Sequence, residues 1–174
     1  MNVAALFVRR DSHYKAMAGV DAYDESRDAL TWPGGCPVVA HPPCRAWGRY
    51  LTVAKPAPGE RELALWAVAM ARRFGGVVEH SLSSGLWCAV GCLSPGVRDQ
   101  FGGILIPAYQ SWWGHRAEKA TGFYVVGPLP PMPDVLNVGN LLPVELMGRA
   151  ERERTPPELA SWLVEVALTC GRVQ

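Results

Sequence analysis

The chain has 174 residues, of which 49% are hydrophobic and 19% are charged, and its formal net charge at pH 7 is +1. This length suits one folded domain spanning residues 1–174, and this composition excludes a disordered chain. The small net charge excludes binding to nucleic acid through bulk charge alone, although a local basic face stays open.

The N-terminus and the cysteines indicate where the protein works. The first ten residues have no basic stretch ahead of their apolar run, which is not the pattern of a secretory signal. No apolar stretch reaches the roughly 20 residues that span a bilayer. The five cysteines are an odd number and widely spaced, so we interpret them as reduced thiols. A cytoplasmic protein of a bacterium or a phage-infected cell, without a membrane partner, is expected.

Short apolar runs predict three strands in the first quarter of the chain. Val3–Val8 is typical of a buried first strand, and Val20–Asp24 alternates and ends on acidic residues. The segment between them, Arg9–Gly19, holds one helical turn. Pro37–Ala40 is predicted to be the third strand, and the following His-Pro-Pro ends it because proline cannot continue a central ladder.

The clearest predicted helix is Gly59–Phe74. Its apolar residues recur at helical spacing, with acidic residues in the first turn and basic residues in the last. Gly75 and Gly76 are expected to end it. The next apolar run, Val77–His80, is predicted to be a strand. Strand, helix and strand with tight connections form a βαβ unit, which predicts a parallel sheet at this point.

The second half of the chain is predicted to complete an α/β fold. Leu82–Gly103 has an irregular pattern, and strands are expected at Ile104–Gln110 and Gly122–Gly127. A proline-rich loop, Pro128–Pro143, precedes a final helix with Thr155 as its N-cap. The predicted fold class is a single Rossmann-like, three-layer α/β domain with a mostly parallel sheet.

Two predicted strand ends carry residues suited to catalysis, His41–Cys44 and Glu79–His80. Ligands bind at the carboxyl ends of strands in parallel α/β sheets, so both segments are expected at one edge. The prolines would fix the loop that carries Cys44. Beside Arg45 and near a helix N-terminus, this thiol is expected to have a lowered pKa and to act as a nucleophile. A carboxylic acid at Glu79 would supply a proton.

The order Pro-Pro-Cys, helix, strand ending in Glu resembles the catalytic half of the DNA cytosine-5 methyltransferases, which have a Pro-Pro-Cys nucleophile and a Glu-Asn-Val acid. The block 114–127 is similar to the family's Gln-x-Arg-x-Arg segment, and more so to the Gly-His-x-x-x-Lys-x-Thr form of phage-encoded methyltransferase-like proteins. Residues 154–158 resemble its late Arg-x-Leu-Thr-x-x-Glu segment. The resemblance covers Pro37 to Val166.

The resemblance implies a DNA base-modifying transferase. Cys44 would add to C6 of a cytosine flipped out of the helix, while Glu79 would engage N3 and the exocyclic amine. S-adenosylmethionine is the implied cofactor, bound by Asp21 or Asp24 at its ribose and by His41. DNA is the implied partner, with a free nucleotide as the alternative. The implied substrate-binding residues are Pro42, Pro43, Arg45, Trp47, His80, Gln110, His115, Arg116, Lys119 and Thr121.

Two departures from the family keep other functions open. Val8–His13 contains no glycine where the family has a glycine-rich cofactor loop, and His80 stands in place of the family's Asn. One alternative is a catalytically degenerate, methyltransferase-like module that binds nucleic acid or a partner. The other is a base- or nucleotide-modifying enzyme that does not use S-adenosylmethionine and that could depend on a metal. An amino-methyltransferase is disfavoured, because His41–Cys44 lacks the acidic and aromatic residues of Asp-Pro-Pro-Tyr.

Further groups of side chains allow both a functional and a structural interpretation. His41, His80 and His115 could bind a metal with Cys44, but their spacing is not that of a compact zinc site, and no metal is expected. Tryptophans at 47, 112 and 113 could stack on a base or pack in the core. Arginines at 149, 152 and 154 could contact phosphate or form a solvated helix start.

Overall fold

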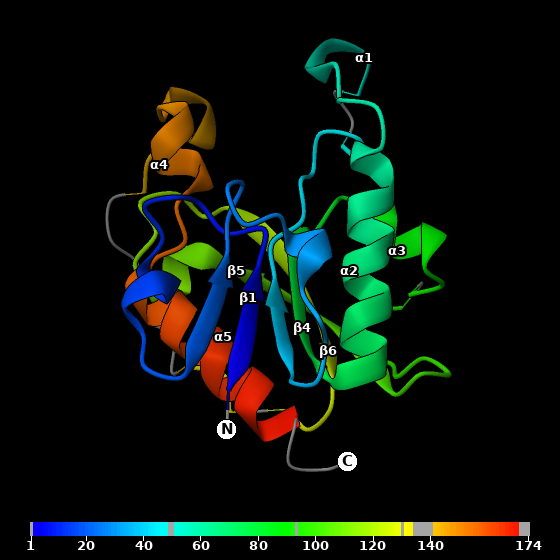
Figure 1. Ribbon diagram of the computed structural model, residues 1–174. Coiled ribbons are helices and arrows are strands. Elements are labelled where there is room, and N and C mark those ends of the chain that lie inside the picture. The colour runs from blue at the N-terminus through cyan, green and yellow to red at the C-terminus, as the bar shows by residue number, and fades with distance from the viewer. Residues whose placement is uncertain (1, 49–50, 93, 130, 134–140, 171–174) are drawn as a thin grey trace.

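A computed structural model describes residues 2–48, 51–92, 94–129, 131–133 and 141–170. Its centre is one six-stranded sheet with the strand order β2-β1-β3-β4-β6-β5 (Figure 1). The first four of these strands in the order run parallel, whereas β6 is antiparallel to both β4 and β5. The sheet confirms the predicted α/β class. The strands are β1 (Val3–Leu6), β2 (Val20–Tyr23), β3 (Val38–Ala40), β4 (Gly76–Ser81), β5 (Gly103–Tyr109) and β6 (Ala120–Val126).

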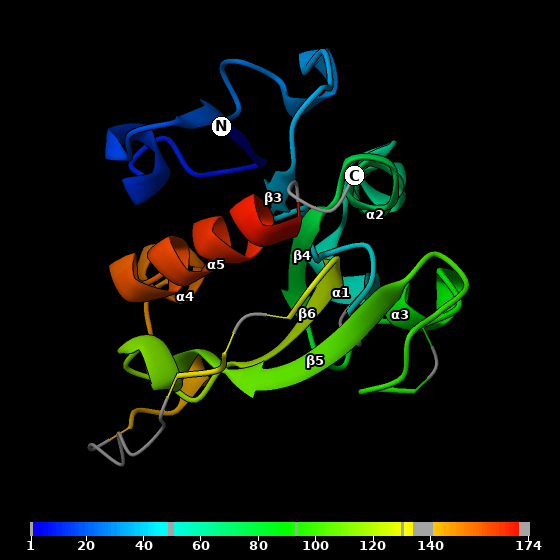
Figure 2. The ribbon, with the colours of Figure 1, turned by 90° about the horizontal axis from the view of Figure 1, so that it is seen from below.

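Helices cover both faces of this sheet. Helix α5 lies on one face, and α2 and α3 lie on the other (Figure 2). Short α1 and α4 stand beyond the edge where the parallel strands end (Figure 1). The α-helices are α1 (Leu51–Ala54), α2 (Glu60–Phe74), α3 (Leu86–Ala89), α4 (Arg149–Glu153) and α5 (Pro157–Cys170), and the 3-10 helices are η1 (His13–Ala16), η2 (Ala29–Thr31), η3 (Gln110–Trp113) and η4 (Val144–Leu146).

The core lies on both sides of the sheet, and β3 contributes to each side. Val39 packs in the cluster that includes Leu163 of α5, whereas Val38 packs in the cluster that includes Val68 of α2. All four of these side chains are fully or almost fully buried. A strand covered on both faces needs a continuous apolar sequence, which explains the Val-Val-Ala pattern of β3.

The βαβ unit β3–α2–β4 forms as predicted, and Val38 pairs with Gly76 in parallel register. The chain passes from β1 outward to β2, and then returns to β3 on the other side of β1. Strand order therefore reverses between β1 and β3, and such a reversal opens a crevice beyond the carboxyl ends of the strands. This crevice receives the residues after β1, β3 and β4.

Several element boundaries differ from the prediction. Helix α3 lies within 82–103, which was expected to be irregular, and Gln110 opens η3 instead of ending β5. Helix α5 starts at Pro157 and Ala160 N–H donates to the Pro156 carbonyl, so Thr155 is not its N-cap. In the proline-rich segment 128–143, residues 130 and 134–140 lie outside the described residues. Over the part of the chain that is described, no helix is long and apolar enough to cross a membrane.

We expect Gly76→Ala to destabilise the protein by about 4 kcal/mol or more, because its φ of 122° is strained for other residues and a Cβ there would lie 2.0 Å from the Val38 carbonyl oxygen. Urea unfolding would measure the loss. The control Gly91→Ala has a φ of 77° but no atom within 4 Å of the added carbon, and should cost only about 1–2 kcal/mol. Equal losses in both variants would contradict the steric explanation.

Candidate active site

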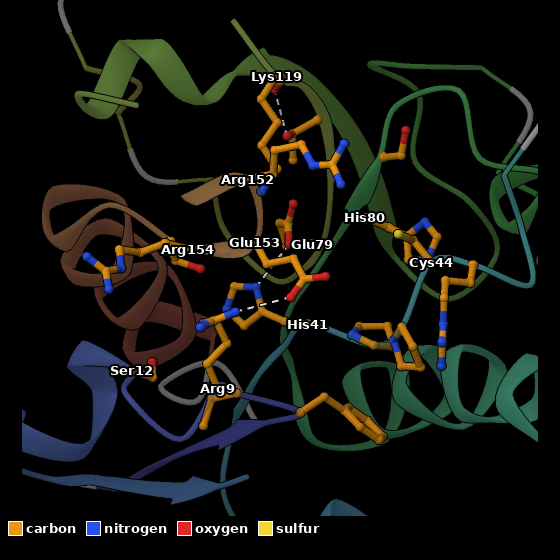
Figure 3. A pocket seen from close by; sticks show the side chains of 18 of the residues that line it. Arg9, Ser12, His41, Cys44, Glu79, His80, Lys119, Arg152, Glu153 and Arg154 are labelled. Carbon is orange, nitrogen blue, oxygen red and sulfur yellow. Dashed lines mark hydrogen bonds and ion pairs between the residues drawn. The ribbon is translucent and has the colours of Figure 1, made fainter. Parts of the chain in front are cut away.

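A pocket of about 730 Å³ lies at the carboxyl ends of β1, β3 and β4 (Figure 3). Its walls come from the loops that follow these strands, from η1, from the start of β6 and from the segment around α4. Pockets of this size enclose small molecules. The lining residues are 7–9, 11–14, 41–45, 48, 54, 79–81, 119–121, 144 and 152–155.

A chain of hydrogen bonds crosses this pocket from η1 to β6. The Tyr14 hydroxyl lies 3.0 Å from Nε2 of His41, whose Nδ1 lies 3.0 Å from Oε2 of Glu79. Nε2 of Gln110 donates to Oε1 of Glu79 at 2.9 Å and to Oγ1 of Thr121 at 3.1 Å. The Glu79 carboxylate is therefore held through both of its oxygens.

Glu79 is ionised in this arrangement. Burial by itself would raise the pKa of its carboxyl, but the hydrogen bond with His41 and the positive charge of Lys119 outweigh it and lower the pKa to about 2. The side chain is only 15% exposed. The sequence analysis expected Glu79 to be a proton-donating acid, and this part of the expectation is wrong for the free protein. The group is a fixed carboxylate that can accept hydrogen bonds from a ligand.

The lowered pKa of Glu79 predicts an acid-sensitive contribution to stability. Since the folded-state pKa of about 2 lies below the ordinary value of 4.5, the contribution is complete above pH 4.5 and disappears as pH falls toward 2. The shift corresponds to roughly 3 kcal/mol in the free energy of unfolding. Urea unfolding between pH 6 and pH 2.5 should show a shallower pH dependence for Glu79→Gln than for the wild type. Parallel curves would contradict the assigned ionisation.

Cys44 lines the pocket in the loop after β3 and is exposed. The pocket wall still covers part of this side chain, and the resulting desolvation of the thiol raises its pKa, which the Glu79 carboxylate raises further. The expected net lowering of this pKa by Arg45 does not occur, and the guanidinium of Arg45 donates to Glu60 at 3.0 Å. Cys44 is thus a neutral thiol in the free protein, and it must lose its proton as it reacts.

His80 lies under the Pro-Pro-Cys loop and is 2% exposed. Burial lowers the pKa of its imidazole, and the charge of Glu79 and the carbonyl of Pro43 only partly oppose this effect. Among the described residues, neither ring nitrogen has a partner in good hydrogen-bond geometry, the Pro43 carbonyl included, and the ring packs edge-on against Trp87. His80 is therefore a neutral, buried residue that helps to line the pocket.

Two residues with strained backbones help to form the pocket wall. Phe7, directly after β1, has a φ of 59°, and Lys119, directly before β6, has a φ of 42°. Residues with side chains rarely adopt such values, and they cluster at functional sites. The Lys119 carbonyl accepts from Oγ1 of Thr121 at 2.9 Å, which fixes this turn. The backbone from which the Lys119 side chain extends is thereby fixed at the pocket.

The rim of the pocket carries ion pairs between the loop after β1 and the segment around α4. Arg9 pairs with Asp11 at 2.9 Å and with Glu153 at 3.1 Å, and Arg154 pairs with Asp11 at 3.1 Å. The Arg9–Glu153 and Arg154–Asp11 pairs connect segments more than 140 residues apart in sequence. Exposed pairs of this kind contribute little stability individually, but they fix the position of the α4 segment over the pocket.

Of the three residues expected to bind S-adenosylmethionine, one lines the pocket and two do not. His41 lines the pocket, but Asp21 pairs with Arg27, and the buried Asp24 carboxylate pairs with Lys15 and accepts from the backbone N–H of Ser26 at 2.9 Å. Neither Asp21 nor Asp24 lines the pocket, and both carboxylates are engaged by cations, Asp24 while buried and Asp21 at the surface. These residues do not fit the cofactor site that the resemblance implies.

The structure brings together some of the expected substrate-binding residues and separates the others. Besides Cys44 and Glu79, the pocket contains Pro42, Pro43, Arg45, His80, Lys119 and Thr121. Gln110 is fully buried behind Glu79 and reaches the site through that carboxylate and through Thr121.

The remaining expected residues have structural contacts instead. Trp47 is buried, donates to the Arg61 carbonyl at 3.1 Å and is covered by the Arg61 guanidinium, so it cannot stack on a base. His115 is buried in a local turn, with Nδ1 accepting from the Ala117 N–H. Arg116 pairs with Glu151 outside the pocket. Trp113 is buried in the α5 core, and Trp112 packs against it.

Sequence reasoning missed the pocket residues of η1 and of the loop before it, most notably Tyr14. Tyr14 is 1% exposed, and burial raises the pKa of its hydroxyl well above the ordinary value, with Glu79 adding to the effect. Nothing in the local sequence around Tyr14 indicates its contact with His41, which lies 27 residues away. Of the proposed arginine patch, Arg152 and Arg154 line the pocket, and the Arg149 side chain lies outside the described residues.

No protein-family model matches the sequence, and no curated protein matches it either. Among the described residues, no three His, Cys, Asp or Glu side chains are grouped so as to hold a metal ion. The case for a function rests on the pocket and on the chemistry of its residues.

Proposed function

We propose that this chain is an enzyme that modifies a pyrimidine base, with Cys44 adding to C6 of the ring and Glu79 holding its N3 edge. The observation that carries the proposal is the shared pocket of an exposed thiol and a fixed carboxylate, at the carboxyl ends of the neighbouring strands β3 and β4. The proposal also takes the fold to be Rossmann-like and similar to the catalytic half of cytosine-5 methyltransferases. The five cysteines of the chain are free thiols, which suits the reducing cytoplasm in which we propose that the protein works.

The ionised Glu79 explains how a cytosine would become reactive. Its carboxylate would accept a hydrogen bond from the exocyclic amine and, as a nearby negative charge, would favour a proton on N3. A protonated N3 draws electrons from the ring and makes C6 electrophilic. The Cys44 sulfur then bonds to C6, its thiol proton leaves to solvent, and the ring electrons shift to C4–C5 and neutralise N3.

This addition makes C5 nucleophilic, and a proton from water is the simplest electrophile that C5 can take. Loss of the original C5 hydrogen followed by release of Cys44 restores the base with an exchanged hydrogen. S-adenosylmethionine is not part of this proposal, because Asp21 and Asp24 are engaged by Arg27 and Lys15. Exchange at C5 therefore tests base activation without any added donor.

The test is hydrogen exchange in D₂O, followed by the NMR signal of the C5 hydrogen. The substrates are deoxycytidine, its 5′-monophosphate and a short single-stranded oligonucleotide with one cytosine. We expect exchange at C5 of at least one of them at neutral pH, at a rate proportional to protein concentration. Absence of exchange in all three at millimolar substrate would overturn the proposal.

A second candidate is a non-catalytic module that binds a base without reacting with it. The raised pKa of the Cys44 thiol favours this candidate, because a neutral thiol is a poor nucleophile. It predicts that cytosine compounds bind without exchange at C5, and that Cys44→Ala leaves their affinity unchanged. The exchange measurement separates the two candidates.

A further inference from the structure

We infer that the pocket recognises the 5′-phosphate of a free pyrimidine nucleotide through Lys119 and Arg152, so that the substrate is a nucleoside monophosphate and not a DNA strand. The inference rests on the proposed function for the identity of the base, and on separate observations for the phosphate. Those observations are the two pocket cations that form no ion pair among the described residues, the overall charge of the pocket, and the ion pairs formed by the arginines at its rim.

Lys119 and Arg152 are the pocket cations without a carboxylate at ion-pair distance in the part of the chain that the structure describes. Among the described residues, neither of them forms an ion pair, although every other arginine that lines the pocket does. Figure 3 shows both side chains on the Glu79 side of the pocket, away from Arg9 and Ser12. An ammonium and a guanidinium at one wall of a pocket match the oxygens of a phosphate.

The position of Lys119 indicates a phosphate attached to the base that Glu79 holds. Its charge is close enough to contribute to the lowered pKa of Glu79, and it is two residues from Thr121, which also lines the pocket. The turn that presents Lys119 has a strained backbone, with a φ of 42°. A lysine that served only as a solvated surface residue would not require a strained backbone conformation.

The charge of the pocket fits one phosphate monoester. Five Arg or Lys residues and three carboxylates are found among the described residues that line it, and Glu60 beside it pairs with Arg45, which gives a formal charge of +1 with the histidines neutral. Lys119 and Arg152 supply two positive charges at one wall. A phosphate monoester carries about −1.5 to −2 at pH 7. The pocket volume of about 730 Å³ is that of a small-molecule site.

The rim is unsuited to a polynucleotide. A DNA strand is bound by several cations that exchange counterions for phosphates. Here the rim cations Arg9 and Arg154 are already paired with Asp11 or Glu153, and Arg45 is paired with Glu60. The carboxylates of Asp11 and Glu153 would also face the phosphates of a strand entering the pocket.

Calorimetric titration of the whole chain with three probes tests the inference: 2′-deoxycytidine 5′-monophosphate, deoxycytidine, and a single-stranded hexanucleotide with one cytosine. We expect the monophosphate to bind at least 10-fold more tightly than the nucleoside. Lys119→Met and Arg152→Leu should each remove most of this difference, and each should weaken nucleotide binding far more than nucleoside binding. The control Arg73→Leu removes one exposed positive charge from the last turn of α2, outside the pocket, and should leave all three affinities unchanged.

Other outcomes would overturn the inference. Equal affinities for nucleotide and nucleoside would show that the phosphate is not recognised, and tighter binding of the hexanucleotide with a steep salt dependence would indicate a DNA substrate. Exchange at C5 in the hexanucleotide but not in the monophosphate would overturn the inference and leave the proposed chemistry standing. Phosphate-dependent binding without exchange at C5 would support the inference and overturn the proposed chemistry. Failure of all three probes to bind would overturn the inference.

Discussion

Replacing Cys44 by alanine is expected to lower the rate of C5 hydrogen exchange by at least about 10³-fold, because the sulfur forms the bond that activates the ring. Binding of the base should change by no more than a few-fold, since Glu79 and the pocket wall stay in place. Cys44→Ser should be almost as inactive, because a hydroxyl is a much weaker nucleophile than a thiol. The NMR exchange assay measures the rate, and calorimetry measures the affinity.

Cys88→Ala is a matched control for this experiment, because Cys88 is also an exposed free thiol but lies on α3, outside the pocket. We expect its exchange rate to equal that of the wild type. An exchange rate that survives in Cys44→Ala would remove Cys44 from the mechanism. An equal loss in both cysteine variants would point to a general effect of thiol removal instead of catalysis.

Glu79→Gln is expected to slow exchange by about 10²–10³-fold, the size of effect seen when a group that stabilises developing charge is removed. A neutral amide cannot favour a proton on N3 as a carboxylate does. The ratio of wild-type to variant rates should therefore narrow as pH falls, because solvent then protonates N3 unaided. Rates measured between pH 7.5 and 5 would give this ratio.

Glu62→Gln is the control, since Glu62 is an exposed carboxylate in the first turn of α2 and lies outside the pocket. Its exchange rate should match the wild type at every pH. A constant ratio between wild type and Glu79→Gln across this range would indicate that Glu79 only shapes the pocket. A purely structural role would also leave exchange partly intact at neutral pH.

The pairing of Cys44 with Glu79 could be anticipated because it depends on local patterns. Apolar runs mark strands, prolines mark their ends, and a tight helical connection makes two strands parallel neighbours. The structure confirms that β3 and β4 are adjacent, so the residues that follow or end them reach one pocket. Helix α2 ends at Phe74, and the glycines at 75 and 76 follow it as predicted.

The electrostatic state of the site could not be anticipated, because it depends on partners far apart in sequence. His41 meets Glu79 across 38 residues and Tyr14 across 27, and these contacts arise only when η1 packs against β2 and α5. They turn the expected acid into a fixed carboxylate. Burial against the same wall, together with that carboxylate, raises the pKa of Cys44, which sequence reasoning expected to fall.

The sequence by itself determined the α/β class, the βαβ unit and the strand ends that carry Cys44 and Glu79, because burial period and turn residues are local properties of a chain. Only the tertiary structure decided which charged groups face a ligand. Asp24 is engaged by Lys15, Arg9 and Arg154 are paired at the rim, and Lys119 and Arg152 form no ion pair among the described residues. Which charged groups are paired follows from long-range packing, because packing sets the distances between charges and their exposure to water.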